Sequence, residues 1–162
     1  MRARAMLQAT VVVGGLASMV LAGCASGGMG AKKMSADEAI AARQKLMKDQ
    51  GAAMKAISDA AKAGQLQVIP AEAEKLRVTA KEIPALFPQG SVNAATSRAK
   101  PEIWQKWAEF EGSAKSLETK ASALATTAKG GDAAATNTAV AELGKTTCGA
   151  CHTAFRGPEI KK

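Results

Sequence analysis

Five residues near the C-terminus constrain the fold more than any other part of the sequence. They form the pattern C-x-x-C-H and read Cys148-Gly149-Ala150-Cys151-His152. This is the attachment signature of c-type haem, in which two thiols form thioether bonds to one haem and the histidine becomes an axial ligand of the iron. Positions i, i+3 and i+4 share one face of a helix, so one turn can present all three side chains to one porphyrin. The pattern therefore predicts a helix that carries one covalent haem c.

Other uses of the motif are weaker. His152 is the only histidine of the chain, so no other imidazole can be the proximal ligand. A thioredoxin-like C-x-x-C should follow a strand in a βαβ unit, and no such pattern precedes Cys148. A structural zinc site needs four ligands, whereas this neighbourhood offers three. A disulfide between Cys148 and Cys151 stays open as an alternative, but it leaves His152 without a role.

Composition favours a single helical domain. The 162 residues are 47% apolar, mostly through alanine, with 3% aromatic residues and no tyrosine, and alanine-rich sequence with little proline favours helix. The formal charge is +8, and +6 without the first 23 residues, which suits an acidic partner or an anionic surface. Nucleic acid is not an expected partner, because the charges are scattered and no basic stripe is interleaved with aromatic residues.

The N-terminus has the pattern of an export signal. A positive start, Met1 to Arg4, precedes an apolar run that is too short and too rich in glycine for a spanning helix. Its end, Leu21-Ala22-Gly23-Cys24, resembles the lipobox of bacterial lipoproteins, in which the cysteine is lipidated and becomes the new N-terminus. We therefore expect a signal peptide over 1–23, lipidation at Cys24 and a flexible tether over 24–34. Ordinary cleavage near Ala25 is the alternative.

Four amphipathic helices are expected in the remainder, 35–162. The first begins with a capping box, Ser35 to Glu38, and ends at Gly64. The second begins near Pro70 and ends or kinks at Pro84. After an irregular loop to about residue 100, the third runs from Pro101 to Gly130 and the fourth from about Asp132 to Gly157. With no strand pattern in competition, the sequence predicts an all-α, antiparallel, up-down four-helix bundle with a cofactor between facing helices.

A C-x-x-C-H motif on the last helix of such a bundle resembles the class II c-type cytochromes, the cytochrome c prime family. In most class I cytochromes the motif lies near the N-terminus instead. Further stretches that resemble the family are Arg43-Gln44 followed by Met47, Phe87-Pro88-Gln89-Gly90-Ser91, Pro101-Glu102-Ile103-Trp104 and His152 to Arg156.

The resemblance implies roles for three residues of the first helix. Arg43 should pair with a haem propionate and Gln44 should hydrogen-bond near it, whereas a solvated charge is the ordinary use of such an arginine. Met47 should lie over the distal face of the iron. There its sulfur either ligates the metal, as in low-spin members, or only packs, as methionine at helical spacing usually does.

These inferences predict an exported monohaem cytochrome of the bacterial periplasm, anchored to the membrane through lipidated Cys24. It should transfer single electrons to and from redox partner proteins of the envelope, with His152 and Met47 as the two ligands of the iron, and it should not be an enzyme. One alternative is a five-coordinate, high-spin haem protein that binds NO or CO, and a second is a haem-free envelope lipoprotein. Family members often form dimers through the first two helices, so the resemblance leaves both a monomer and a homodimer as alternatives.

Overall fold

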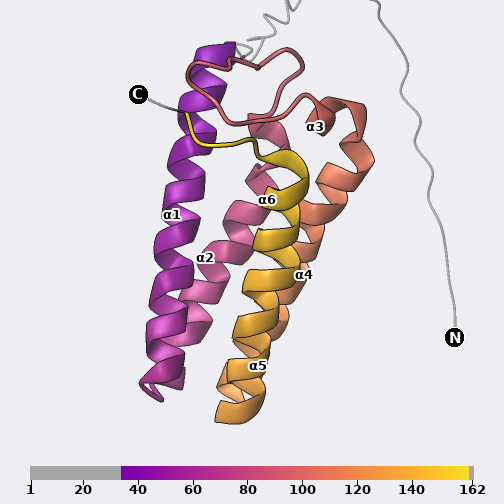
Figure 1. Ribbon diagram of the computed structural model, residues 1–162. Coiled ribbons are helices and arrows are strands. Elements are labelled where there is room, and N and C mark those ends of the chain that lie inside the picture. Colours follow the sequence, from indigo (N-terminus) through magenta and orange to yellow (C-terminus); the bar gives the residue numbers. More distant parts are fainter. Residues whose placement is uncertain (1–33, 161–162) are drawn as a thin grey trace, which may run out of the picture. The chain divides into compact units, whose positions relative to one another are not determined.

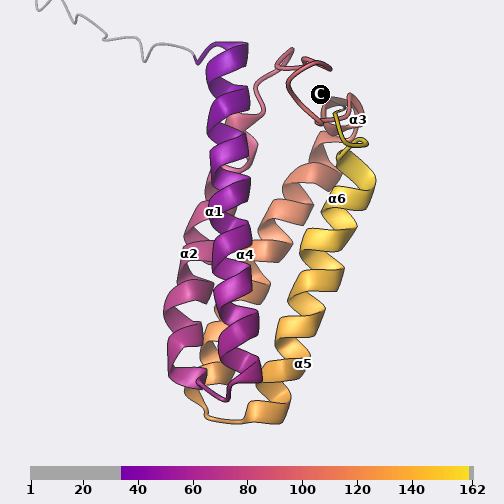
Figure 2. The ribbon, with the colours of Figure 1, turned by 60° about the vertical axis from the view of Figure 1, so that its left-hand side comes forward.

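The computed structural model describes residues 34–160, which form four antiparallel helical rods (Figure 1). The chain runs down one rod and up the next, twice, and Figure 2 shows the same order from another side. The rods are, in chain order, α1 (Ala36–Lys62), α2 (Ile69–Glu82), α3 (Glu102–Gln105) with α4 (Trp107–Lys129), and α5 (Ala133–Leu143) with a π-turn (Gly144–Gly149) and α6 (Ala150–Phe155). The prediction of an all-α, up-down four-helix bundle is confirmed.

Local sequence signals set most helix ends. Ser35 Oγ accepts a hydrogen bond from the Glu38 amide, and Glu38 Oε2 accepts one of 2.8 Å from the Ser35 amide, which completes the predicted capping box. Gly64 and Gly131 follow α1 and α4 with φ of 70° and 79°. This left-handed conformation favours glycine, so the two residues turn the chain at the same end of the bundle.

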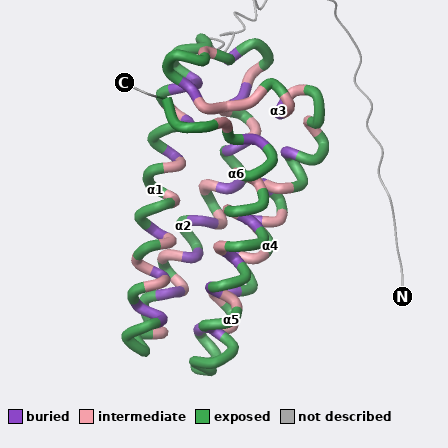
Figure 3. Tube along the Cα trace, in the orientation of Figure 1, coloured by how far each residue is buried: buried purple, intermediate pink, exposed green. Residues whose placement is uncertain are grey.

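The core lies along the inward stripe of each rod (Figure 3). α2 packs most extensively on α4, and α1 packs on α2. The stripes contain the apolar residues whose spacing indicated helices, among them Ile57, Leu76, Ile103, Leu124 and Leu143, each less than 2% exposed. Within the described residues, no helix combines the length and the apolar character that a membrane span needs.

The third and fourth helices are each interrupted, although the sequence predicted them as continuous. Lys106, with φ −120° and ψ 46°, separates α3 from α4. At this break the indole of Trp104 donates a hydrogen bond of 3.0 Å to the Phe87 carbonyl, which ties α3 to the preceding loop. The fourth helix contains the π-turn directly before and within the C-x-x-C-H motif. At Lys106 the interruption thus accompanies a tertiary contact of the neighbouring Trp104.

Candidate functional site

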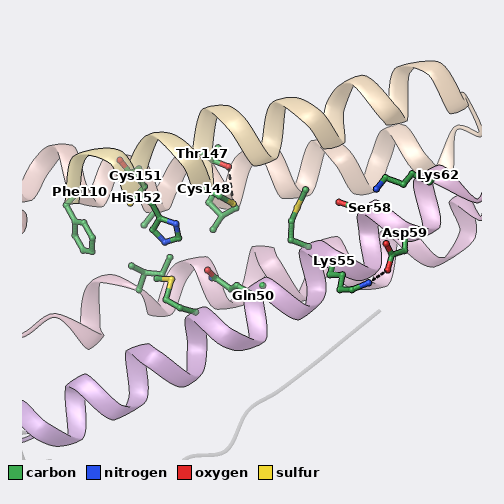
Figure 4. A pocket seen from close by; sticks show the side chains of 17 residues that line it. Gln50, Lys55, Ser58, Asp59, Lys62, Phe110, Thr147, Cys148, Cys151 and His152 are labelled. Atoms are coloured by element: carbon green, nitrogen blue, oxygen red, sulfur yellow. Dashed lines mark hydrogen bonds and ion pairs between the residues drawn. The ribbon is translucent and has the colours of Figure 1, made fainter. Parts of the chain in front are cut away.

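A cavity of about 470 Å³ lies between α1, α4 and the last helix, and Figure 4 shows the side chains that line it. Apolar residues from several helices form much of its wall, among them Ile83, Phe110, Ala114 and Leu117. Ser113 of α4 also lines it, and the other lining residues lie on α1 and on the last helix, which are far apart in the sequence. The fold therefore brings together the first and last helices around one space.

The three side chains of the motif all line this cavity. Cys148, Cys151 and His152 are half-buried, and both thiols are free, so the alternative of a disulfide between them is not what the structure contains. The alternative of a zinc site finds no support either: among residues 34–160, no three His, Cys, Asp or Glu side chains form a group that could hold a metal ion.

Burial controls the protonation of the motif. It raises the pKa of the Cys151 thiol, the neighbouring Cys148 raises it further, and a hydrogen bond from Ser113 on α4 opposes the shift. Burial also lowers the pKa of His152, with further lowering by the positive charges of Arg156 and Arg98. The imidazole is therefore held in the neutral form, which is the form that ligates a metal.

Met47 reaches the same cavity from α1. It is half-buried and packs against the core, and Met54, two helical turns further along, also lines the space. Both methionines thus face the cavity that the motif faces. Flexible thioether side chains can fill an irregular space and can also ligate iron.

Arg43 and Gln44 hold a loop and are not among the residues that line the cavity. The buried guanidinium of Arg43 donates hydrogen bonds of 2.9 and 2.8 Å to Ser91 Oγ and the Ser91 carbonyl, and one of 2.7 Å to Ser97 Oγ. It also lies 4.6 Å from the centroid of the Phe87 ring. The exposed Gln44 donates a hydrogen bond of 2.6 Å to the Thr96 carbonyl.

The side chain of Arg43 carries a positive charge that no carboxylate among the described residues neutralises. All its hydrogen-bond acceptors are neutral, and burial lowers its pKa. A buried cation of this kind is costly unless an anion is near.

The loop that Arg43 holds is fastened in turn to the end of α6. The Gly157 amide donates a hydrogen bond of 2.7 Å to the Arg98 carbonyl, and the Lys100 amide donates one of 3.1 Å to the Phe155 carbonyl. Ala99 and Arg156 form an antiparallel bridge between the same segments. Sequence reasoning did not find Ser97 or Ser113 as partners of Arg43 and Cys151. The one sequence feature that could have indicated Ser113 as a residue of the site is its position next to Ala114, which belongs to the apolar stripe of the third predicted helix.

The residues present fit a haem c. A porphyrin needs a largely apolar cavity with few polar groups, two thiols for its vinyl groups and a neutral imidazole for its iron. Cys148, Cys151, His152 and the apolar wall supply these groups, while the polar residues of α1 in the lining are Gln50, Lys55, Ser58, Asp59 and Lys62.

Comparisons with known proteins agree with this arrangement. The family model described as Cytochrome C' matches residues 38–156. The cytochrome c' of Pararhodospirillum photometricum is 38% identical over 117 residues, which cover 70% of this chain and 92% of that protein. The crystal structure of cytochrome c' from Thermochromatium tepidum superimposes with a TM-score of 0.69 at 31% identity, over 78% of this chain and 99% of that one.

Two further structures bear on ligands and assembly. A cytochrome c' described as having an unusual ligand-controlled dimer dissociation is 27% identical with a TM-score of 0.69, over 76% of this chain and 98% of that chain. A nitric oxide complex of a cytochrome c prime variant from Alcaligenes xylosoxidans is 25% identical with a TM-score of 0.67, with the same coverage.

The bundle and its motif define a class II c-type cytochrome. This chain belongs to the cytochrome c' family and carries a single covalent haem c. The predicted family and cofactor are confirmed, and the alternative of a haem-free lipoprotein is excluded. The predicted signal peptide over 1–23, the lipidation site Cys24 and all but the last residue of the tether over 24–34 lie outside the described residues.

Proposed function

We propose that this cytochrome is a one-electron carrier, not an enzyme, in which His152 and Met47 are the two axial ligands of the iron. The observation that carries the proposal is that both side chains line one cavity from opposite ends of the chain. With two protein ligands the metal has no free position for a substrate, so the site favours electron transfer.

In this proposal the motif residues and the apolar wall have different roles. Cys148 and Cys151 hold the haem covalently, and His152 stays neutral because burial and two nearby cations lower its pKa. The apolar wall, including Phe110 and Leu117, supplies the contacts for the porphyrin. When bound, the haem supplies an iron that gains or loses one electron.

Arg43 has a second part in this proposal, as partner of a haem propionate. Its buried guanidinium has only neutral acceptors among the described residues, so an incoming carboxylate is the anion that it lacks. The bonds to Ser91 and Ser97 use three of the five N–H donors of the guanidinium, so Nε–H and one Nη1–H remain for a carboxylate oxygen. Gln44, one residue along α1, is the further donor that we assign to this edge of the haem.

A gas-binding protein is the second candidate. In that case the iron is five-coordinate, Met47 only packs, and NO or CO occupies the distal side. The nitric oxide complex of the cytochrome c prime variant from Alcaligenes xylosoxidans favours this candidate.

Substitution of Met47 separates the two candidates. If its sulfur ligates iron, the purified ferric protein is low-spin at neutral pH and shows the weak charge-transfer band in the red that thioether ligation gives. Met47→Ala then becomes high-spin, binds CO readily and has a lower reduction potential, because a thioether favours reduced iron. The matched control is Met54→Ala, which removes the other methionine of the cavity and should leave the spin state unchanged. A wild-type ferric spectrum that is purely high-spin excludes ligation by Met47.

We further propose that the protein is exported to the periplasm and anchored to the membrane through Cys24, where it exchanges electrons with partner proteins of the envelope. The lipobox at Leu21 to Cys24 and the surplus of positive charge support this location and an acidic partner. Wild-type protein should fractionate with membranes, whereas Cys24→Ala should be soluble or keep its signal. Wild-type protein found entirely in the soluble fraction contradicts the anchor. A homodimer is also part of the proposal, to be tested by the mass of the protein in solution.

A further inference from the structure

The last rod contains a regular pattern that would spread over about 120° of the circumference of an uninterrupted α-helix. Leu143, Thr147, Cys151 and Phe155 follow one another in steps of four residues. On an α-helix each such step advances the side chain by about 400°, which is about 40° beyond one turn. Three steps therefore leave Phe155 about 120° away from Leu143 around the helix axis. In the structure, however, both lie in the same core, with exposures of 5% and 0%.

The π-turn between Gly144 and Gly149 removes this difference. Each hydrogen bond of a π-turn spans one residue more than that of an α-turn. The residues after the turn are therefore rotated around the helix axis by about 100° less than on a continuous α-helix, which is the rotation of one residue. Leu143 and Phe155 then differ by only about 20°. Phe155 can therefore pack edge to face on Phe110, with ring centroids 5.4 Å apart, while Leu143 stays buried.

Two residues favour the wide turn. A Cβ on Gly149 would lie 3.3 Å from the Gly144 carbonyl oxygen, which is a tight contact, whereas a Cβ on Gly144 would make only an ordinary contact of 3.7 Å with the methyl group of Met54. Thr147 is 3% exposed, and its hydroxyl donates a hydrogen bond to the Leu143 carbonyl at the start of the turn. Its Oγ1 also lies 3.8 Å from Cys148 Sγ. A dashed line marks this interaction in Figure 4.

We propose that the π-turn is a positioning device for the haem site. It sets the rotation of the C-x-x-C-H motif relative to α5, so that Cys151 and His152 face the cavity while Phe155 is anchored in the core. Gly149 and Thr147 are positioning residues that maintain it. The inference rests on the haem site but is independent of whether Met47 ligates the iron.

The effect of the π-turn on the orientation of the motif can be tested with a double glycine substitution and with a deletion that should reverse its effect. Gly144→Ala with Gly149→Ala favours a continuous α-helix, because alanine has a high helix propensity and because a Cβ at position 149 crowds the Gly144 carbonyl oxygen in the π-turn. The motif should then rotate away from the cavity by about the rotation of one residue. The expected result is a shift of the Soret maximum, a changed high-spin to low-spin ratio and faster amide exchange in α6, compared with wild type.

Deletion of the exposed Lys145 in the same double variant should restore the wild-type properties. Cys151 and Phe155 would then stand seven and eleven residues after Leu143, which brings both within about 20° of its face on an uninterrupted α-helix. Gly112→Ala is the control. This exposed glycine of α4 has no atom within 4 Å of an added Cβ, so its substitution should leave the spectrum unchanged.

Haem per chain is measured on all samples, which separates attachment from orientation because every variant keeps Cys148, Cys151 and His152. A loss of haem in the double variant supports the proposal only if deletion of Lys145 reverses it. The proposal is overturned if the double variant has the wild-type spectrum and amide exchange, or if the deletion fails to restore them. Neither result depends on the effect of Met47→Ala.

Discussion

The two sides of this bundle are built differently. Where α2 meets α4, small and branched side chains such as Ala73, Leu76, Ala80 and Ala121 are at most 1% exposed. Where α1 faces the last helix, the side chains are half-buried and include Met47, Met54, Cys148, Cys151 and His152, with the cavity between them. Alanine lets backbones approach closely, whereas long side chains around a cofactor keep them apart. One side thus stabilises the bundle and the other receives the haem.

This division means that the haem itself completes the core on one side. A cavity without its occupant lacks the contacts that a packed interior makes. The closely packed side needs no such partner, so the two sides should respond differently to the same kind of change.

Loss of the haem should have the largest effect. Cys148→Ser with Cys151→Ser removes both thiols, so no haem-sized mass and no haem staining should remain on the denatured chain. Amide exchange should become fast in α6 and around Met47, while α2 and α4 stay the most protected. A covalent haem that survives the double substitution contradicts the attachment through these residues.

Truncation of one apolar side chain on each side should separate stability from function. Leu76→Ala should destabilise the holo-protein by about 2–5 kcal/mol, because it leaves a cavity in a closed interior, and should not alter the haem spectrum. Met54→Ala should cost less, because Met54 is only partly buried and borders an existing space. Denaturant unfolding of both holo-proteins measures whether Leu76→Ala loses more free energy of unfolding than Met54→Ala. Equal losses of stability would remove the contrast between the two sides.

Arg43 connects α1 to the loop above the cavity. Arg43→Met keeps the length of the side chain but removes the three hydrogen bonds to Ser91 and Ser97, and each buried group left unsatisfied costs about 1–3 kcal/mol. We expect a lower free energy of unfolding and a changed reduction potential if a propionate is also lost. Gln44→Met is the matched control for the stability measurement, since that side chain is exposed. An unchanged stability in Arg43→Met would show that the loop is held by other contacts.

The smallest effect is expected at the exposed start of α1. Hydrogen bonds to the Ser35 amide and, secondly, to its hydroxyl lower the pKa of Glu38 from the ordinary 4.5. Because the folded pKa lies below the unfolded one, this contribution to stability is complete above pH 4.5 and is lost as the pH falls through the folded pKa. Glu38→Gln should lose that pH dependence in unfolding curves while leaving the haem spectrum unchanged. If wild type and Glu38→Gln have the same dependence of stability on pH, Glu38 does not make this contribution.

Sequence reasoning found the helices and the haem-binding motif because each depends on neighbours in the chain. The capping box at Ser35, the glycine turns and the four-residue and three-residue steps of apolar side chains all specify local structure. The pattern C-x-x-C-H specified the cofactor for a similar reason, since its three functional groups lie within one helical turn. The break at Lys106 was missed, because it accompanies a contact between Trp104 and the carbonyl of Phe87, which is remote in the sequence.

By itself, the sequence predicted the four-helix bundle and the covalent haem, both of which are confirmed, and it singled out Cys148, Cys151 and His152 as the residues that we propose hold the haem. Only the tertiary structure decided that Met47 shares their cavity, that Arg43 is buried against Ser91 and Ser97, and that a π-turn precedes the motif. The physical reason is that helix periodicity gives the face of a residue but not what another helix brings opposite it. The steps of four from Leu143 to Phe155 were visible in the sequence, but only the structure shows that both ends lie in one core and that a π-turn separates them.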